Sequence, residues 1–238
     1  MAQTKRLSNF FLKFASGVSI FGLIIVFAFL YQPLTDQLFP AFSKLLIGSL
    51  YATICLLGIL AIFYPKNCEN SLMFKRTPQS QERPYSANIS GTVRIKGHHP
   101  DCQYFSKHWI EIRKRTLCAA CIGLLIGAMA SLVGTIFYFF VGFVPFFADL
   151  RVLLVGYAGM LLGLFQFKLG GYVKLTANAL FVFSTFITLI AADTLGASLL
   201  VDFYVIGLFI FLLLTRILIS EWNNKRICTK CEMCRLLE

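Results

Sequence analysis

Residues 117–140 read LCAACIGLLIGAMASLVGTIFYFF. This run contains no charged residue, and it is longer than the roughly 20 apolar residues that an α-helix needs to cross the hydrocarbon core of a bilayer. The whole chain follows the same trend, because its mean hydropathy is +0.74 and only 14% of its residues are charged. These values lie outside the range of soluble globular proteins and predict an all-α, multi-pass membrane protein.

Six apolar runs predict six transmembrane helices, at residues 14–31, 41–64, 117–140, 152–167, 175–192 and 199–219. The fourth run is the shortest, and only Pro145 and the Asp149/Arg151 pair separate it from the third. We therefore expect four parts: a tail with the first two membrane helices at 1–64, a polar loop at 65–116, a four-helix membrane region at 117–221 and a Cys-rich tail at 222–238.

The basic residues predict the orientation of these helices. If the N-terminus is inside, Lys44 and Arg151 are the only two of the 22 Lys and Arg residues that fall on the outer side. This is the positive-inside pattern, so we expect the protein in the cell membrane with both termini in the cytoplasm. The net charge of +11 is then explained by orientation and by attraction to anionic lipid headgroups, worth about 1 kcal/mol per Lys or Arg near the surface. Nucleic-acid binding is not expected.

The candidate ligands for a metal gather in the predicted cytoplasmic loop. All three histidines lie within eleven residues, and seven of the eight cysteines fall on the cytoplasmic side, where thiols stay reduced. A Cys-x-x-Cys pair lets two thiolates reach one tetrahedral ion, and Cys or His from a neighbouring turn complete its shell. The predicted zinc ligands are Cys102, His108, Cys118 and Cys121, and His98 or His99 could replace Cys102 or His108. The alternative is that the Cys pair is only the first turn of the third helix and that the histidines are solvated.

A second group of thiols lies in the C-terminal tail, at Cys228, Cys231 and Cys234. Three thiolates at this spacing suit zinc or three corners of an iron–sulfur cluster. Cys68, which follows the second helix, or a spare histidine could supply the fourth ligand. The alternatives are palmitoylation near the membrane and a thiol tail with no bound metal. The eighth cysteine, Cys55, lies inside a predicted span as a small apolar residue.

Local patterns predict further structure around these ligands. Residues 92–96 alternate like a short strand, and from Asp101 onward Phe105, Trp109 and Ile112 recur at helical spacing, which predicts an amphipathic helix on the membrane surface. Two small-xxx-small patterns, at Gly123/Gly127 and Gly159/Gly163, favour close helix packing within the chain. The other use of such faces is contact with a second copy or a membrane partner.

Several classes of function are not expected. The chain has no Cys-x-x-Cys-His motif and no histidine in a span, so neither an attached nor a membrane haem has ligands. No charged residue lies near the centre of a span, which counts against an ion pathway. The sequence also gives no sign of a phosphate-binding loop, a serine nucleophile or a carboxylate pair.

The segment Cys118-Ala-Ala-Cys121-Ile-Gly123-Leu-x-x-Gly127, with residues 98–102 and Phe105 before it, resembles an uncharacterised family of prokaryotic predicted membrane proteins. In that family, a Cys/His stretch precedes Cys-Ala-x-Cys-x-Gly-Leu/Ile-x-x-Gly at the start of a membrane helix. The chain departs from the pattern in His108, in a longer basic segment and in its Cys-rich tail. The resemblance implies a multi-pass membrane protein and no known reaction.

Taken together, these patterns favour a non-catalytic membrane protein with a cytoplasmic zinc site that binds, senses or scaffolds, because no general base or nucleophile accompanies the ligands. One alternative is a membrane redox or electron-transfer subunit with an iron–sulfur cluster on Cys228, Cys231 and Cys234. Another is a metal or small-solute transporter, against which the lack of ligands inside the spans counts.

Overall fold

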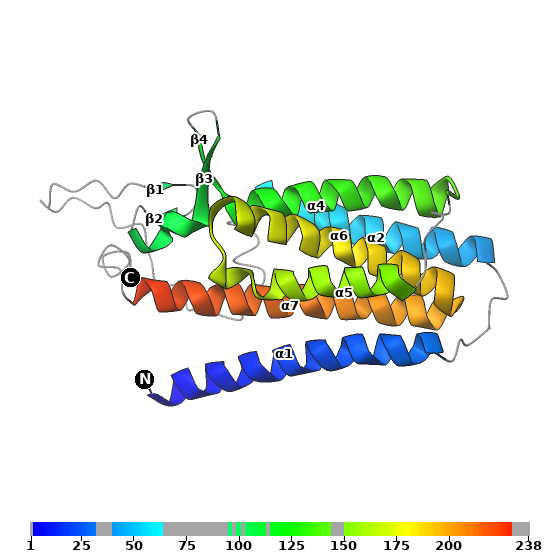
Figure 1. Ribbon diagram of the computed structural model, residues 1–238, viewed down its shortest axis with the longest axis horizontal. Helices are drawn as coiled ribbons and strands as arrows, with labels where there is room; N and C mark the ends of the chain where they lie inside the picture. The colour runs from blue at the N-terminus through cyan, green and yellow to red at the C-terminus, as the bar shows by residue number, and fades with distance from the viewer. Residues whose placement is uncertain are drawn as a thin grey trace, which may run out of the picture.

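The computed structural model describes residues 2–31, 40–63, 95–96, 99–100, 103–112, 115–143 and 150–229. Helices lie side by side along the long axis of the molecule, and consecutive helices alternate in direction (Figure 1). In chain order they are α1 (Ala2–Tyr31), α2 (Pro40–Phe63), α4 (Ala119–Thr135), α5 (Leu150–Leu164), α6 (Gly171–Gly196) and α7 (Leu199–Cys228). The π-helical turn η2 (Ile136–Phe140) continues α4, and the short 3-10 helix η3 (Gln166–Lys168) follows α5.

Five of these helices are long and apolar enough to cross a membrane, namely α1, α2, α4 with η2, α6 and α7. The prediction of an all-α membrane protein is therefore confirmed. The predicted fourth span corresponds to α5, which has 15 residues and is about 22 Å long at 1.5 Å per residue. That is shorter than the roughly 30 Å hydrocarbon core, so the count of six spans stays a prediction.

Small residues let α4 and α5 approach α6 closely, and α6 is the most buried of the spanning helices. A Cβ atom at Gly123 or Gly127 would collide with backbone oxygens of α6, and one at Gly159 or Gly163 would collide with α6 side chains. Both small-xxx-small faces thus pack against α6 within the chain, as predicted.

The described part of the polar loop forms short strands rather than a surface helix. The strand β1 (Ile95–Lys96) pairs with β2 (His99–Pro100), the 3-10 helix η1 (Gln103–His108) follows, and β3 (Trp109–Ile112) pairs antiparallel with β4 (Arg115–Cys118). The predicted strand at 92–96 is confirmed for residues 95–96, and residues 92–94 lie outside the described part.

The predicted amphipathic helix is wrong beyond His108. The sequence Trp109-Ile-Glu-Ile112 is rich in aromatic and β-branched residues, which favour extended backbone. Ile110 is buried while its neighbour Glu111 is exposed, and Ile110 lies opposite Leu117 in the hairpin. Pairing with β4 satisfies the backbone hydrogen bonds of this segment. The preference for a strand therefore outweighs the helical spacing of the large apolar residues.

The bundle has two ends that differ in chemistry. At the end called here the thiol end, α4 and α6 begin, α2, α5 and α7 end, and the β3–β4 hairpin projects (Figure 1). At the other end, called the aspartate end, α6 ends and α7 begins after Ala197 and Ser198. The start of α1 and the end of α7 both lie at the thiol end (Figure 1).

Candidate functional site

The site begins with two cysteines where β4 becomes α4. Cys118 is the last residue of β4 and the N-cap of α4, with an extended backbone (φ −69°, ψ 119°), and Cys121 lies one turn into the helix. Neither cysteine is in a disulfide, and their side chains are hydrogen-bonded to each other. The Cys-x-x-Cys spacing therefore places both sulfurs at the positive end of the α4 dipole, where anionic sulfur is favoured.

Two buried cations face these thiols. Lys174, in the first turn of α6, is 5% exposed, and Arg216 of α7 is 6% exposed. Both interact electrostatically with Cys118 and Cys121. Within the described residues neither cation pairs with a carboxylate. Because an unpaired buried charge is costly, sulfur is the group placed to balance these two charges.

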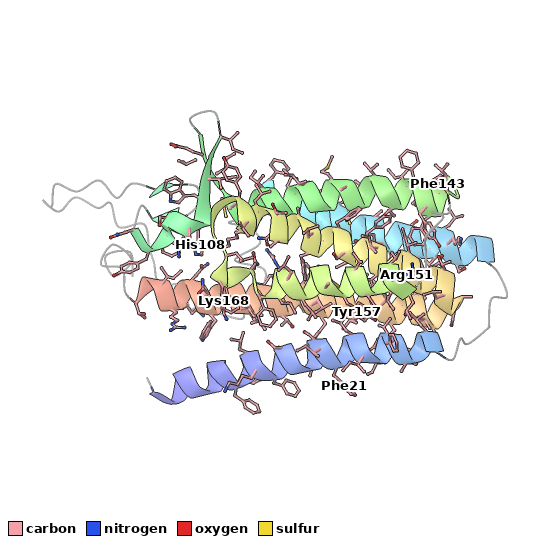
Figure 2. All side chains as sticks on the ribbon, viewed as in Figure 1. Phe21, His108, Phe143, Arg151, Tyr157 and Lys168 are labelled. Atoms are coloured by element: carbon pink, nitrogen blue, oxygen red, sulfur yellow. The ribbon has the colours of Figure 1, made fainter. Side chains whose placement is uncertain are left out.

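His108 is linked to the thiols through Lys174. It ends η1, is buried, and has its Nδ1 3.1 Å from the Nζ of Lys174. If Lys174 is an ammonium it can only donate, and in that case this Nδ1 accepts and the neutral imidazole carries its hydrogen on Nε2. The ring of Phe105 packs edge-on against His108 at 5.2 Å. In this arrangement His108 positions a lysine, and Figure 2 shows it at the thiol end of the bundle.

Neutral side chains hold Arg216. Its guanidinium donates to the side-chain oxygen of Asn178, whose amide nitrogen donates to the backbone oxygen of Lys174 at 2.5 Å. The amide of Gln166, with its oxygen turned toward the guanidinium, accepts from Nε and Nη2 at 2.9 Å each. The guanidinium also lies over the ring of Phe181, 5.5 Å from its centroid. These partners fix Arg216 without cancelling its charge.

An apolar cavity of about 580 Å³ leads to the same groups. It lies between α2, α4, α6 and α7, and its walls include Tyr51 and Phe209. Cys118, Cys121 and Arg216 also line it, so the thiol pair adjoins a space of suitable polarity for a lipid-soluble molecule.

The predicted metal ligands are brought together only in part. The structure describes the side chains of His108, Cys118 and Cys121, and it describes only the backbone of His99 and Cys228; Cys68, His98, Cys102, Cys231 and Cys234 lie outside the described residues. The side chains of Cys118 and Cys121 interact with each other, and His108 contacts Lys174, which in turn faces the two thiols. Within the described part of the chain no three His, Cys, Asp or Glu side chains form a group that could hold a metal. The four-ligand zinc site and the tail cluster remain predictions, and Cys55 is buried, as expected.

Sequence reasoning missed the buried charges. The positive-inside pattern places Lys174 and Arg216 on the inner side without predicting their burial, and the predicted spans leave Asp193 in the outer loop after residue 192. The structure places Asp193 and Asp202 in contact at the aspartate end, so the expectation that no carboxylate pair exists is wrong. The predicted spans leave six residues, 193–198, between the two helices, whereas in the structure only Ala197 and Ser198 connect α6 to α7. A connection this short sets the side chains just before and after it at the same level.

Comparison of the chain with protein-family models, with curated proteins and with solved structures finds no match. The function is therefore argued from the site itself.

Proposed function

We propose that this is a six-span membrane protein that holds a zinc ion at its cytoplasmic face through Cys118 and Cys121, in a non-catalytic binding, sensing or scaffolding role. The observation that carries the proposal is the burial of Lys174 and Arg216 beside two thiols. Neither cation is paired with a carboxylate among the described residues. A zinc ion with three or four thiolates has a net negative charge, and two adjacent cations offset that charge.

The surroundings favour a thiolate-rich ligand set. The N-termini of α4 and α6 both point toward the thiol end, which adds the positive ends of two helix dipoles to the two cations. Because the Nδ1 of His108 is bonded to Lys174, we propose Cys102 as the third ligand and His98, His99 or another cytoplasmic cysteine as the fourth. His108 then orients the lysine that faces the cluster.

The direct test is a metal inventory of the full chain, purified in detergent without chelator. We expect zinc in stoichiometric amount, lost in Cys118→Ser and in Cys121→Ser. Cys55→Ser is the matched control, because Cys55 is a buried thiol of α2 and should leave the zinc content unchanged. Equal zinc in all four proteins would contradict the proposal.

A second candidate, favoured by the cavity that reaches both thiols, is a dithiol redox centre. Oxidation would join the two sulfurs in one disulfide and release two protons and two electrons. A lipid-soluble quinone in the cavity would accept both and become a quinol. Loss of two free thiols when a short-chain quinone is added anaerobically to metal-free protein would support this function. Unchanged thiols would exclude it.

One anaerobic absorption spectrum of the purified protein separates the remaining alternatives. A brown protein whose visible absorption is lost in Cys231→Ser would support the iron–sulfur cluster on the C-terminal cysteines. A colourless, zinc-containing protein would support the zinc site. Metal uptake into proteoliposomes that is insensitive to Cys118→Ser would count against transport through these ligands.

A further inference from the structure

The aspartate end contains a buried carboxyl pair that is independent of the thiols. Asp193, in the last turn of α6, is 5% exposed, and Asp202, in the first turn of α7, is 1% exposed. Ala197 joins the two helices in a left-handed conformation (φ 42°), which lets α7 turn back along α6. Two carboxyl groups from separate helices thus meet out of contact with water.

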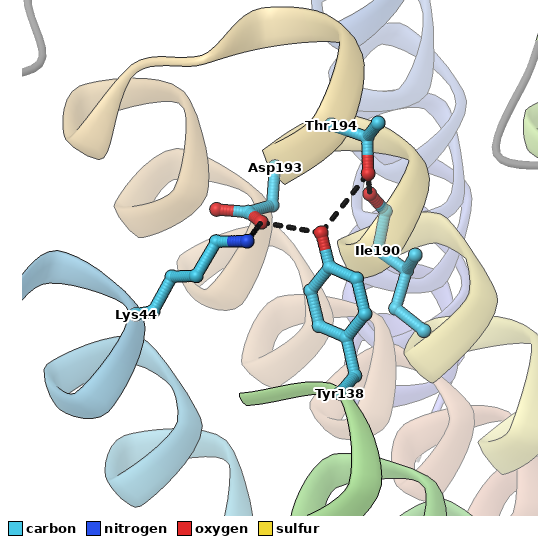
Figure 3. A network of polar contacts seen from close by, with 5 residues as sticks. All are labelled: Lys44, Tyr138, Ile190, Asp193 and Thr194. Carbon is cyan, nitrogen blue, oxygen red and sulfur yellow. Dashed lines mark hydrogen bonds and ion pairs between the residues drawn. The ribbon is translucent and has the colours of Figure 1, made fainter. Parts of the chain in front are cut away.

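Asp193 has two further partners, both on the same oxygen (Figure 3). The hydroxyl of Tyr138 donates to its Oδ2 at 2.6 Å, and the Nζ of Lys44 lies 3.8 Å from that atom. Tyr138 is also 3.0 Å from the hydroxyl of Thr194. The side chain of Lys44 is 34% exposed, so its ammonium connects the buried pair to the surface of the bundle.

Asp202 lacks comparable partners. Its side chain interacts with that of Asp193, while its Oδ1 is buried with no hydrogen-bond partner within the described residues. A carboxylate has only acceptor oxygens, so two neighbouring buried carboxyl groups can hydrogen-bond to each other only if one of them keeps a proton. The charges agree, because within the described part of the chain the two carboxyl groups face one ammonium, that of Lys44. Arg151 lies at the same end but on the exposed start of α5 (Figure 2).

We propose that Asp193 and Asp202 together form a proton-binding site at the aspartate end of the bundle, with one proton shared between them. With the proton bound, the group of two carboxyls and Lys44 is neutral. Without it, one uncompensated negative charge stays buried where α6, α7 and the end of α4 meet. A proton fits better than a metal ion, because a hydrogen bond needs only two oxygens and Tyr138 and Lys44 already occupy one oxygen of Asp193.

The site couples folding to pH in a definite direction. Ordinary carboxyls in the unfolded chain are ionised at neutral pH, whereas this pair keeps a proton in the folded protein. Folding therefore takes up a proton, and the stability that the shared proton contributes is present at low pH and lost as the pH rises.

The test compares thermal unfolding of the full chain in detergent, from mildly acidic to mildly alkaline pH. Asp202→Asn replaces the protonated carboxyl with a neutral group of the same shape. We expect the wild-type midpoint to fall as the pH rises and the Asp202→Asn midpoint to stay level. Glu221→Gln is the matched control, because Glu221 is an exposed carboxyl paired with Lys225 at 3.9 Å, and it should keep the wild-type slope. Equal slopes in all three proteins would overturn the proposal.

Two further measurements keep the test decisive if Asp202→Asn does not fold. The infrared carbonyl band of a protonated carboxyl should be present in the wild type at neutral pH and lost in Asp193→Asn. In Lys44→Met the fall in midpoint should move to higher pH, because the remaining proton is then held more tightly. If the carbonyl band is absent and sodium, but not potassium, stabilises the wild type, the site binds a sodium ion rather than a proton. That result would overturn the proposal.

Discussion

The two ends of the α6–α7 helix pair bury opposite charges. At the thiol end, α6 and α7 contribute Lys174 and Arg216, which face sulfur. At the aspartate end the same two helices contribute Asp193 and Asp202, which face each other and one half-exposed lysine. In both places, buried charged groups lie beside groups that can gain or lose a proton. The two proposals differ in the same way: a zinc ion held by thiolates is proposed where the fixed charges are positive, and a bound proton is proposed where they are negative.

The largest effect should come from removing the sulfur while keeping the cations. In metal-free protein, the double variant Cys118→Ser/Cys121→Ser should lose about 3–5 kcal/mol of unfolding free energy, because Arg216 cannot be neutralised and stays unpaired. Adding Lys174→Met and Arg216→Met should restore part of that loss. The wild type, the cysteine double variant, a Lys174→Met/Arg216→Met variant and the protein with all four changes form a thermodynamic cycle, measured by denaturant unfolding. Purely additive losses would show that sulfur and cations do not interact.

The close contact between α4 and α6 positions the thiols, so filling it should be the next most costly change. Gly123→Ala places a methyl group against the backbone oxygen of Leu175 and should cost about 1–3 kcal/mol. Gly17→Ala, where no atom lies within 4 Å, is the control and should be neutral or slightly stabilising. Thermal unfolding measures both, and equal midpoints would mean that α4 shifts freely.

At the aspartate end, Tyr138→Phe removes the donor to a buried carboxyl and should cost about 1–3 kcal/mol. Tyr157→Phe is the matched comparison, because the hydroxyl of Tyr157 donates to a neutral acceptor, the backbone oxygen of Leu23, at 2.9 Å. Its loss should cost only about 0.5–1.5 kcal/mol. If the two losses are the same, the carboxyl at Asp193 is no more dependent on its donor than a backbone carbonyl.

The smallest effect is expected at Lys44, whose ion pair with Asp193 is long and partly solvated. Lys44→Gln should cost about 0–1 kcal/mol at low pH, where the shared proton already neutralises the pair. The cost should grow at alkaline pH, where the shared proton is lost and the ammonium of Lys44 still faces the carboxylates. Unfolding midpoints at the two pH values measure this difference, and a cost that does not change with pH would separate Lys44 from the carboxyl pair.

Five of the six predicted spans correspond to helices long enough to cross a membrane, because bilayer thickness dictates the length of an apolar run, as residues 117–140 show. The cysteine pair and the small faces of α4 and α5 were also found, since each is a local pattern within one helix. The buried charges were not predicted, because Lys174, Asp193, Asp202 and Arg216 lie near the ends of the predicted spans. At those positions hydropathy cannot tell a buried side chain from one at the membrane interface. Only the packing of α6 against its neighbours reveals which of them face inward. The strands at 109–118 were missed because apolar residues at helical spacing also fit a paired hairpin.

The junction at Cys118 has a mechanical consequence. This residue closes the β4 strand and opens α4, so no connecting loop is present to absorb a displacement. The hydroxyl of Tyr172 ties the hairpin to α6 through the backbone oxygen of Glu111 at 3.3 Å, and that contact is exposed. A displacement of the β4 strand would therefore pass to Cys118, and so to the thiol pair, through the backbone itself.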